Sequence, residues 1–253
     1  MQNSPFTFIT PLEYPDYDDR LRGLATACWP LFMLQDPVAD QLWDRLNEYF
    51  PHLQFALVDT RTNKVIAEAN SVALHWQSDM HTLPEGGWDW VFQQAVADHQ
   101  AGKPANIQSA IQIAIHPHYR GQGLSALMVQ KMRQVGEAHG FKKLIAPVRP
   151  SQKSDYPLIN IDEYITWQRE DGLPYDAWLR VHARAGAKII KACHHAMEIS
   201  GTREDWQKWT GLNFPQSGEY TLPGGLVPMI YDAHGNRGIY IEPNVWMVHE
   251  LGS

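Results

Sequence analysis

The segment from residue 115 to residue 125 has the residue types of an anion-binding turn. Its Arg120 stands beside Gly121 and Gly123, and a helix is predicted to begin at Leu124. The first turn of a helix has backbone N–H groups without an intrahelical partner, and the helix dipole adds partial positive charge there. Glycine lets a phosphate group approach these N–H groups closely. The spacing fits neither the dinucleotide fingerprint nor a P-loop, so it predicts another phosphate site, or else a tight turn that binds nothing.

Two predicted strands and a helix position this turn. Before it, Ile111, Ile113 and Ile115 alternate with Gln112 and Ala114, which is typical of a strand with one apolar face. After it, apolar residues recur at helical spacing from residue 124 to residue 135, and a glycine at position 140 is suited to end that helix. A short apolar strand is predicted at residues 144–148.

The rest of the chain predicts both strands and helices. We expect an antiparallel hairpin from two strands, at residues 53–57 and 65–76, because the turn between them is polar. Further strands are predicted at 6–9, 187–200, 226–232 and 238–248. Further helices are predicted at 14–27, 37–49, 88–99, 161–167 and 204–209, with another that starts at 171–174.

The central string Ile115-x-Pro117-x-x-Arg120-Gly121-x-Gly123-Leu124-Ser125 resembles the acyl-CoA-binding motif of the GCN5-related N-acetyltransferase (GNAT) superfamily. That motif reads Gln/Arg-x-x-Gly-x-Gly/Ala, and serine takes its last position here. The resemblance implies that the turn holds the CoA pyrophosphate and that the preceding strand pairs with the pantetheine arm. The implied co-substrate is acetyl-CoA or another acyl-CoA. The implied cofactor-binding residues are Ile113, Ala114, Ile115, Arg120, Gly121, Gln122, Gly123, Leu124 and Ser125.

The predicted order of elements is the GNAT order with three additions, roughly at 77–106, 150–172 and 201–225. The resemblance therefore implies an α/β (α+β) GNAT fold, in which a mixed central sheet has helices on both faces and enlarged insertions. We expect a single domain over residues 1–253. We also expect the additions to enclose a pocket around the thioester, because the family frame folds without them.

Two residues are candidates for catalysis through the same resemblance. His182 precedes Gly186 by four residues, where many GNAT enzymes have a tyrosine that protonates the leaving CoA thiolate. An imidazole can give or take a proton near neutral pH, and the alternative is an ordinary helix histidine. Ser151 follows the strand at 144–148, and in this fold that strand end faces the acyl group; the alternative is a turn serine.

The substrate pocket has weaker candidates. Trp29 and Trp76 could line an acyl pocket, although a core position is the alternative for each. Arg149 could pair with a substrate anion or be a surface charge. The histidine pairs at 116/118 and 194/195 have no evident third ligand, so we expect no metal site.

Composition excludes several other classes of protein. The chain has 253 residues, is 44% hydrophobic and carries a formal charge of −7 without a basic run, which argues against nucleic acid or an anionic membrane as a partner. Its two cysteines predict no disulfide framework, and the first ten residues lack a signal-peptide pattern. We expect a cytoplasmic enzyme. The oligomeric state stays open.

Three functions remain open from the sequence. The first is acyl transfer from acyl-CoA to a small-molecule or carrier-protein acceptor, with His182 as proton donor. The second is decarboxylation of malonyl-CoA or methylmalonyl-CoA. It rests on a resemblance of the C-terminal half, including Trp178-Leu179-Arg180-Val181-His182, to the GNAT-like loading domains of polyketide synthases. That resemblance implies that His182 protonates the enolate and that Ser151 stands for the family's threonine. The third is an acyl-CoA sensor without catalysis.

Overall fold

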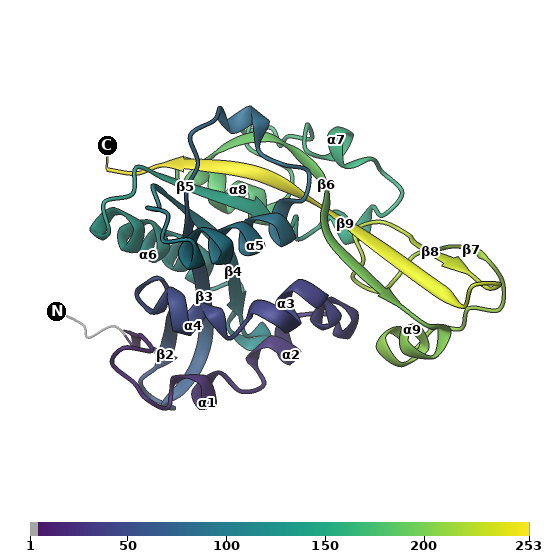
Figure 1. The fold of residues 1–253 in the computed structure, drawn as a ribbon, viewed down its shortest axis with the longest axis horizontal. Helices are drawn as coiled ribbons and strands as arrows, with labels where there is room; N and C mark the ends of the chain where they lie inside the picture. Colours follow the sequence, from purple (N-terminus) through teal and green to yellow (C-terminus); the bar gives the residue numbers. More distant parts are fainter. Residues whose placement is uncertain (1–4, 253) are drawn as a thin grey trace.

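The computed structural model describes residues 5–252, so residues 1–4 and 253 of the predicted domain lie outside it. Nine strands of the described chain form one mixed sheet (Figure 1). The strands are β1 (Phe6–Ile9), β2 (Phe55–Asp59), β3 (Lys64–Leu74), β4 (Ile107–Ile115), β5 (Lys143–Val148), β6 (Lys188–Gly201), β7 (Gly218–Tyr220), β8 (Met229–Asp232) and β9 (Arg237–Glu250). The α-helices are α1 (Tyr17–Leu21), α2 (Leu24–Cys28), α3 (Pro37–Leu42), α4 (Arg45–Tyr49), α5 (Gly87–Gln100), α6 (Leu124–Ala138), α7 (Ile161–Tyr164), α8 (Ala177–Arg184) and α9 (Arg203–Thr210).

The sheet places the central motif in its middle. Strands β1 to β4 are antiparallel neighbours in chain order, which confirms the predicted hairpin of β2 and β3. Strand β5 is parallel to β4 and antiparallel to β9. Strand β6 pairs with the other edge of β9, and the far end of β9 pairs with β8.

Strands β4 and β5 are joined only at their beginnings. Their parallel pairing matches Gln108 with Leu144 and Ser109 with Ile145, and it goes no further. A bulge follows at once in β4, because Ile111 has no counterpart between the pairs that β4 makes with β3 at Ala110 and Gln112. A bulge bends its strand and increases the local twist. The two strands therefore separate, and backbone groups on their facing edges are left without a partner strand.

Helices cover both faces of the sheet, as predicted. On β9, Trp246 and Val248 pack with α5 on one face, while Val245 and Met247 pack with α8 on the other. Helix α6 packs over β2, β3 and β5 through a separate cluster that includes Met128. This alternation follows from the two-residue period of a strand, and it confirms a mixed α/β sheet with helices on both faces.

Three predicted helices differ in detail. The helix expected at 14–27 is divided into α1 and α2 at Gly23, whose φ of 85° lies outside the helical range. The helix expected at 37–49 is divided into α3 and α4, where Leu46 N–H donates to the Trp43 carbonyl in a tighter, three-residue turn. The helix expected from 171 begins instead at Ala177.

That later start has a local cause. Asp176 caps α8, because its side chain accepts hydrogen bonds from the N–H groups of Trp178 (2.8 Å) and Leu179 (3.0 Å). Residues 171–174 form a turn instead, in which Arg169 N–H donates to the Leu173 carbonyl at 2.9 Å.

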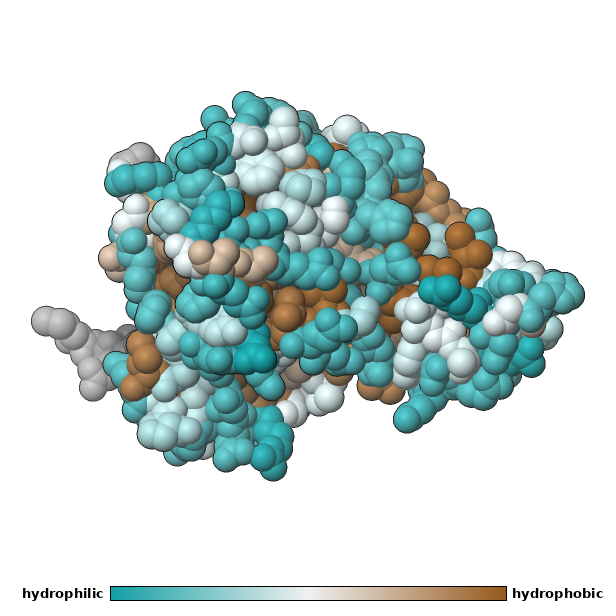
Figure 2. Space-filling model, in the orientation of Figure 1, coloured by the Kyte–Doolittle hydropathy of each residue, from teal (hydrophilic) through white to brown (hydrophobic). Residues whose placement is uncertain are grey.

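The three additions form α5, a segment around α7, and an arm. The arm consists of α9, β7, β8 and the adjoining ends of β6 and β9, and it projects away from the body of the molecule (Figure 1). The buried Lys153 ties the α7 segment to the base of the arm, because its Nζ donates to the carbonyls of Tyr156 and Leu226 at 2.8 Å each. The surface is largely hydrophilic, with apolar groups gathered in the middle and beside the arm (Figure 2). None of the helices in residues 5–252 has the length and apolar character that a bilayer span requires.

Candidate active site

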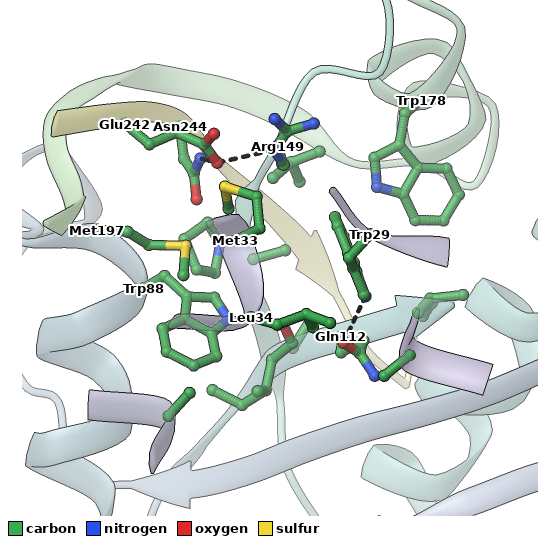
Figure 3. Close-up of a pocket in the computed structure, with 18 of the residues that line it drawn as sticks. Trp29, Met33, Leu34, Trp88, Gln112, Arg149, Trp178, Met197, Glu242 and Asn244 are labelled. Carbon is green, nitrogen blue, oxygen red and sulfur yellow. Dashed lines mark hydrogen bonds and ion pairs between the residues drawn. The ribbon is translucent and has the colours of Figure 1, made fainter. Parts of the chain in front are cut away.

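A cavity of about 400 Å³ lies where β4 and β5 separate. Its walls include residues 110–113 of β4 and residues 146–149 at the end of β5. Four tryptophans come to it from different elements: Trp29, Trp43, Trp88 and Trp178. In Figure 3, Met33, Met197 and Trp88 lie on one side of the cavity, and Trp29 and Trp178 lie on the other. The cavity is therefore mainly apolar and aromatic, with a few polar groups.

Trp29 belongs to a partly buried chain of hydrogen bonds. Its Nε1 donates to Gln112 Oε1 at 2.9 Å (Figure 3). Gln112 Nε2 in turn donates to Glu68 Oε1 at 2.6 Å. Burial raises the pKa of Glu68 to about 7. Trp88 is held in a similar way, because its Nε1 donates to the carbonyl of Ile111 in the bulge at 2.7 Å. Both indoles are thus fixed by polar atoms of the strand that forms the cavity floor.

Arg149 and Glu242 form a buried ion pair in the same wall. Arg149 Nε donates to Glu242 Oε1 at 2.8 Å, and Arg149 Nη2 donates to the Gly224 carbonyl at 2.6 Å. The second carboxylate oxygen of Glu242 accepts from the Tyr240 hydroxyl at 2.7 Å. The guanidinium also lies 6.0 Å from the ring centroid of Trp29. Its charge is consequently offset by Glu242.

His182 reaches the cavity from α8 and forms a hydrogen bond with a second histidine. His182 and Leu179 are the buried residues of α8, and His182 is only 3% exposed. Its Nδ1 lies 2.9 Å from Nε2 of the fully buried His249 on β9. Burial, and next the nearby His249, lower the pKa of His182 to about 3. The ring is therefore neutral at neutral pH, whereas the predicted proton donor would be a protonated imidazole.

The phosphate turn has the predicted geometry. Gly121 and Gly123 have φ values of 76° and 77°, which favour glycine, and α6 begins at Leu124. The first turn of α6 contains no acidic residue, so its free N–H groups keep their positive potential. Arg120 is exposed, and its Nε donates to the Ile115 carbonyl at 3.1 Å. The arginine is thus held against the end of β4.

Two predicted pocket residues lie elsewhere. Ser151 is exposed in a turn and does not line the cavity, because the chain leaves the cavity wall after Arg149. Trp76 also lies outside it and packs edge-to-face on Trp90, with centroids 5.5 Å apart, in the core beside α5. The structure does bring together Trp29, Ile113, Arg149 and His182 at the cavity.

Other cavity residues were not predicted as part of a site. They are Asp40 and Trp43 at α3, Trp88 on α5, Trp178 on α8 and Glu242 on β9, and no local spacing rule relates residues on these four elements. Asp40 is exposed at the cavity and forms no salt bridge within residues 5–252. It contributes a carboxylate that no basic side chain of the described chain offsets.

Comparison with known proteins agrees with this architecture. The family model for acetyltransferases of the GNAT family matches residues 20–159. Arginine N-acetyltransferase avaD of Aspergillus versicolor is 29% identical over an alignment 252 positions long, and the match covers 89% of this chain and 86% of that protein.

Solved structures share the fold. The loading GNATL domain of CurA from Lyngbya majuscula superposes with a TM-score of 0.64 at 19% identity, with 98% of each chain covered. The GphF GNAT-like decarboxylase, solved with isobutyryl-CoA, superposes with a TM-score of 0.56 at 14% identity, covering 98% of this chain and 99% of that one. The family match spans more than half of the sequence, and it includes the phosphate turn and the separated strands. This chain belongs to the GNAT family of acetyltransferases and is an acyltransferase of that type.

Proposed function

We propose that this protein transfers the acetyl group of acetyl-CoA to a nitrogen atom of a small cationic molecule bound in the cavity. One observation carries the proposal. The cavity is continuous with the edge of β4 where β5 has turned away, and that strand leads directly to the phosphate turn before α6. A thioester bound along β4 would thus meet an acceptor in the aromatic cavity.

The chain offers a fitting site for CoA. Residues 120–125 supply two glycines in the left-handed region, an accessible arginine and free N–H groups of a helix start. The edge of β4 around Ile113 supplies backbone groups for an extended pantetheine arm. When bound, acetyl-CoA would supply an activated acetyl group, and the chain's own residues would hold and orient it.

The acceptor class follows from the opposite part of the cavity. Aromatic faces attract cations, and Trp29, Trp43, Trp88 and Trp178 all line the space. Asp40 adds a carboxylate that has no basic partner within residues 5–252, while the positive charge of Arg149 is offset by Glu242. A positively charged amine or guanidine suits this environment better than an anion. The similarity to an arginine N-acetyltransferase supports the same class.

Decarboxylation of malonyl-CoA or methylmalonyl-CoA is the second candidate. The likeness in fold to the CurA loading domain and the GphF decarboxylase favours it, and His182 and Arg149 both line the cavity. Two observations count against it. Glu242 offsets the guanidinium of Arg149, the one arginine of residues 5–252 that lines the cavity, and Ser151 lies outside the cavity. Acetyl transfer is therefore the first candidate.

One assay separates the two candidates. The purified protein is incubated with acetyl-CoA and, in turn, arginine, agmatine, lysine and an aromatic amine, and products are identified by mass spectrometry. Malonyl-CoA alone is tested in parallel. We expect an acetylated amine or guanidine and release of free CoA, with malonyl-CoA unchanged. Conversion of malonyl-CoA to acetyl-CoA without any acceptor product would reject acetyl transfer in favour of decarboxylation.

A further inference from the structure

The two buried histidines require one proton between them. His182 Nδ1 and His249 Nε2 are 2.9 Å apart, a distance typical of a hydrogen bond. A hydrogen bond between two neutral imidazoles needs a donor on one side and a lone pair on the other. Either His182 donates, which leaves its Nε2 as a bare acceptor, or His249 donates, which leaves a proton on Nε2 of His182. The chemistry available to the cavity depends on which arrangement is present.

The surroundings of His249 favour the first arrangement. Burial and the charge of Arg133 lower the pKa of His249, and the Ala185 carbonyl opposes them as a nearby acceptor, although His249 Nδ1 makes no hydrogen bond of ordinary geometry. Since His249 Nε2 is turned to His182, Nδ1 is the ring nitrogen left for that carbonyl, and a proton on Nδ1 avoids placing a lone pair against an oxygen. His249 Nε2 then carries a lone pair and accepts from His182.

Arg133 fixes this corner and keeps His249 neutral. Its guanidinium donates to the Ala185 carbonyl at the end of α8 and, at 3.1 Å, to the Glu250 carbonyl at the end of β9. Burial, together with the charge of Arg133, lowers the pKa of His249 to about 4. The same guanidinium thus joins the two elements that hold the histidines and disfavours a second positive charge there.

We propose that His249 is a positioning residue that holds His182 with its proton on Nδ1, so that Nε2 of His182 faces the cavity as a proton acceptor. Since Nδ1 is turned to His249, Nε2 is the nitrogen left for the cavity that His182 lines. The edge of Trp178 against the His182 ring, with centroids 4.6 Å apart, restricts its rotation.

The role in catalysis rests on the proposed acetyl transfer. The acceptor nitrogen first loses one proton to solvent, so that it attacks as the neutral amine or guanidine. Its lone pair forms a bond to the acetyl carbon, and the bond from that carbon to the CoA sulfur breaks. The second proton of the nitrogen passes to Nε2 of His182 and from there to the leaving sulfur. A weakly basic His182 takes the proton only once the nitrogen has become acidic by bonding to carbon, and it then releases that proton readily.

The tautomer can be read directly. Long-range ¹H–¹⁵N correlation spectra of the full chain, labelled with ¹⁵N in histidine, distinguish a proton on Nδ1 from one on Nε2. The His182 signals are assigned as those missing from His182→Gln. We expect the Nδ1–H form in the wild type at neutral pH, and a shift towards the usual Nε2–H form in His249→Phe. A wild-type His182 in the Nε2–H form, or no change in His249→Phe, would overturn the inference.

Two further variants separate positioning from general loosening. Val248→Ala shortens the neighbouring buried side chain on the opposite face of β9 and leaves the histidine pair in place. We expect its His182 tautomer to be unchanged. His249→Gln offers an amide oxygen in place of Nε2, so it should restore part of the Nδ1–H population of His182. This variant also replaces His249→Phe as the test if His249→Phe does not fold.

Kinetics give the second measurement. With an acceptor that the wild type acetylates, His249→Phe should lower kcat by about tenfold or more, while the KM for acetyl-CoA changes by less than about twofold. His249→Gln should lie between it and the wild type. An unchanged kcat in His249→Phe would reject the catalytic role. The spectra require no turnover. An inactive wild type would therefore count against the proposed function, while the spectra would still test whether His249 sets the tautomer of His182.

Discussion

Arg149 Nε lies 2.8 Å from Glu242 Oε1. Strands β5 and β8 pair with the same edge of β9, and Glu242 lies on β9 between the two paired stretches. The pair fills the gap that the two strands leave. Glu242 is fully buried and Arg149 is 17% exposed at its side chain, so each charge depends on the other.

We expect Arg149→Met to reduce the free energy of unfolding by about 3 kcal/mol, because it leaves a buried carboxylate without its partner. Chemical denaturation measures the change. The double variant Arg149→Met with Glu242→Leu should recover most of the loss, since neither charge is then buried. A loss below about 1 kcal/mol in the single variant would show that the pair does not stabilise this edge.

The hydrogen bond from Trp29 to Gln112 predicts a specific effect on acceptor binding. Trp29→Phe removes the Nε1 donor and leaves Gln112 Oε1 without it, so we expect a stability loss of about 1 kcal/mol. A higher KM for the acceptor should accompany it. Trp76→Phe is the matched control, because Trp76 lies outside the cavity and its buried Nε1 has no partner within residues 5–252. Equal effects of the two variants on KM would contradict the proposed pocket.

Two glycines that flank α6 allow the effect of backbone strain to be separated from an effect on phosphate binding. Gly123 before the helix and Gly140 after it have φ values of 77° and 81°, and neither has other atoms within 4 Å of an added Cβ. Alanine at either position should cost about 1 kcal/mol of stability. Only Gly123→Ala should also raise the KM for acetyl-CoA, because only it lies at the phosphate turn. Steady-state kinetics of both variants measure this difference. An unchanged KM for acetyl-CoA in Gly123→Ala would show that CoA binds elsewhere.

A buried pair of carboxyl groups predicts a pH dependence of stability. Asp36 and Asp89 face each other, and one oxygen of each lacks a hydrogen-bond partner. Burial, and next the charge of Asp36, raise the pKa of Asp89 well above its usual range, and burial raises the pKa of Asp36. The folded chain therefore keeps a proton shared by Asp36 and Asp89 at pH values above about 4, where both carboxyl groups of the unfolded chain have lost theirs. In that pH range the folded chain binds more protons than the unfolded chain. Stability therefore falls as pH rises through this range.

Thermal unfolding between about pH 5 and about pH 9 tests the carboxyl pair. Asp89→Asn keeps a hydrogen-bond donor for Asp36 and removes one titrating group. We expect it to flatten the pH dependence and to raise stability at the alkaline end by about 2 kcal/mol. Asp44→Asn, on an exposed residue, should leave the slope as in the wild type. A wild type that becomes more stable with rising pH would rule out a shared proton.

His194 links three segments on the surface. Its Nδ1 lies 2.9 Å from Glu85 Oε2 and its Nε2 lies 2.8 Å from Asp162 Oδ2, which joins β6 to the loop before α5 and to α7. The hydrogen bonds to Asp162 and then Glu85 raise the pKa of His194. A raised histidine pKa gives stability that is present below about pH 6.5 and is lost as pH rises through the folded-state pKa.

Hydrogen exchange of the α7 segment measures this link. We expect His194→Gln to speed exchange there at mildly acidic pH, by an amount that corresponds to about 0.5 kcal/mol, since the contacts are exposed. The difference from wild type should shrink at alkaline pH. His195→Gln is the control, because the nearest carboxylate to its ring, Glu198, is 3.8 Å away. Faster exchange that does not depend on pH would point to packing instead of charge.

The sequence by itself determined the central motif and most of the frame. Strand β4, the turn with Gly121 and Gly123, helix α6 and strand β5 follow from local rules: alternation, glycine conformation and helical spacing act over a few residues. The same rules found the hairpin of β2 and β3. They missed the division between α1 and α2, because Gly23 stands inside an otherwise helical pattern.

Only the tertiary structure decided the cavity and its chemistry. Trp29 and Gln112 are 83 positions apart, Arg149 and Glu242 are 93 apart, and no local spacing could relate them. The brief pairing of β4 with β5 opens the cavity, and it depends on a bulge that only the partner strand reveals. The state of His182 depends on how deeply α8 packs against β9, because burial beside a second histidine, rather than residue type, sets which protons the ring carries.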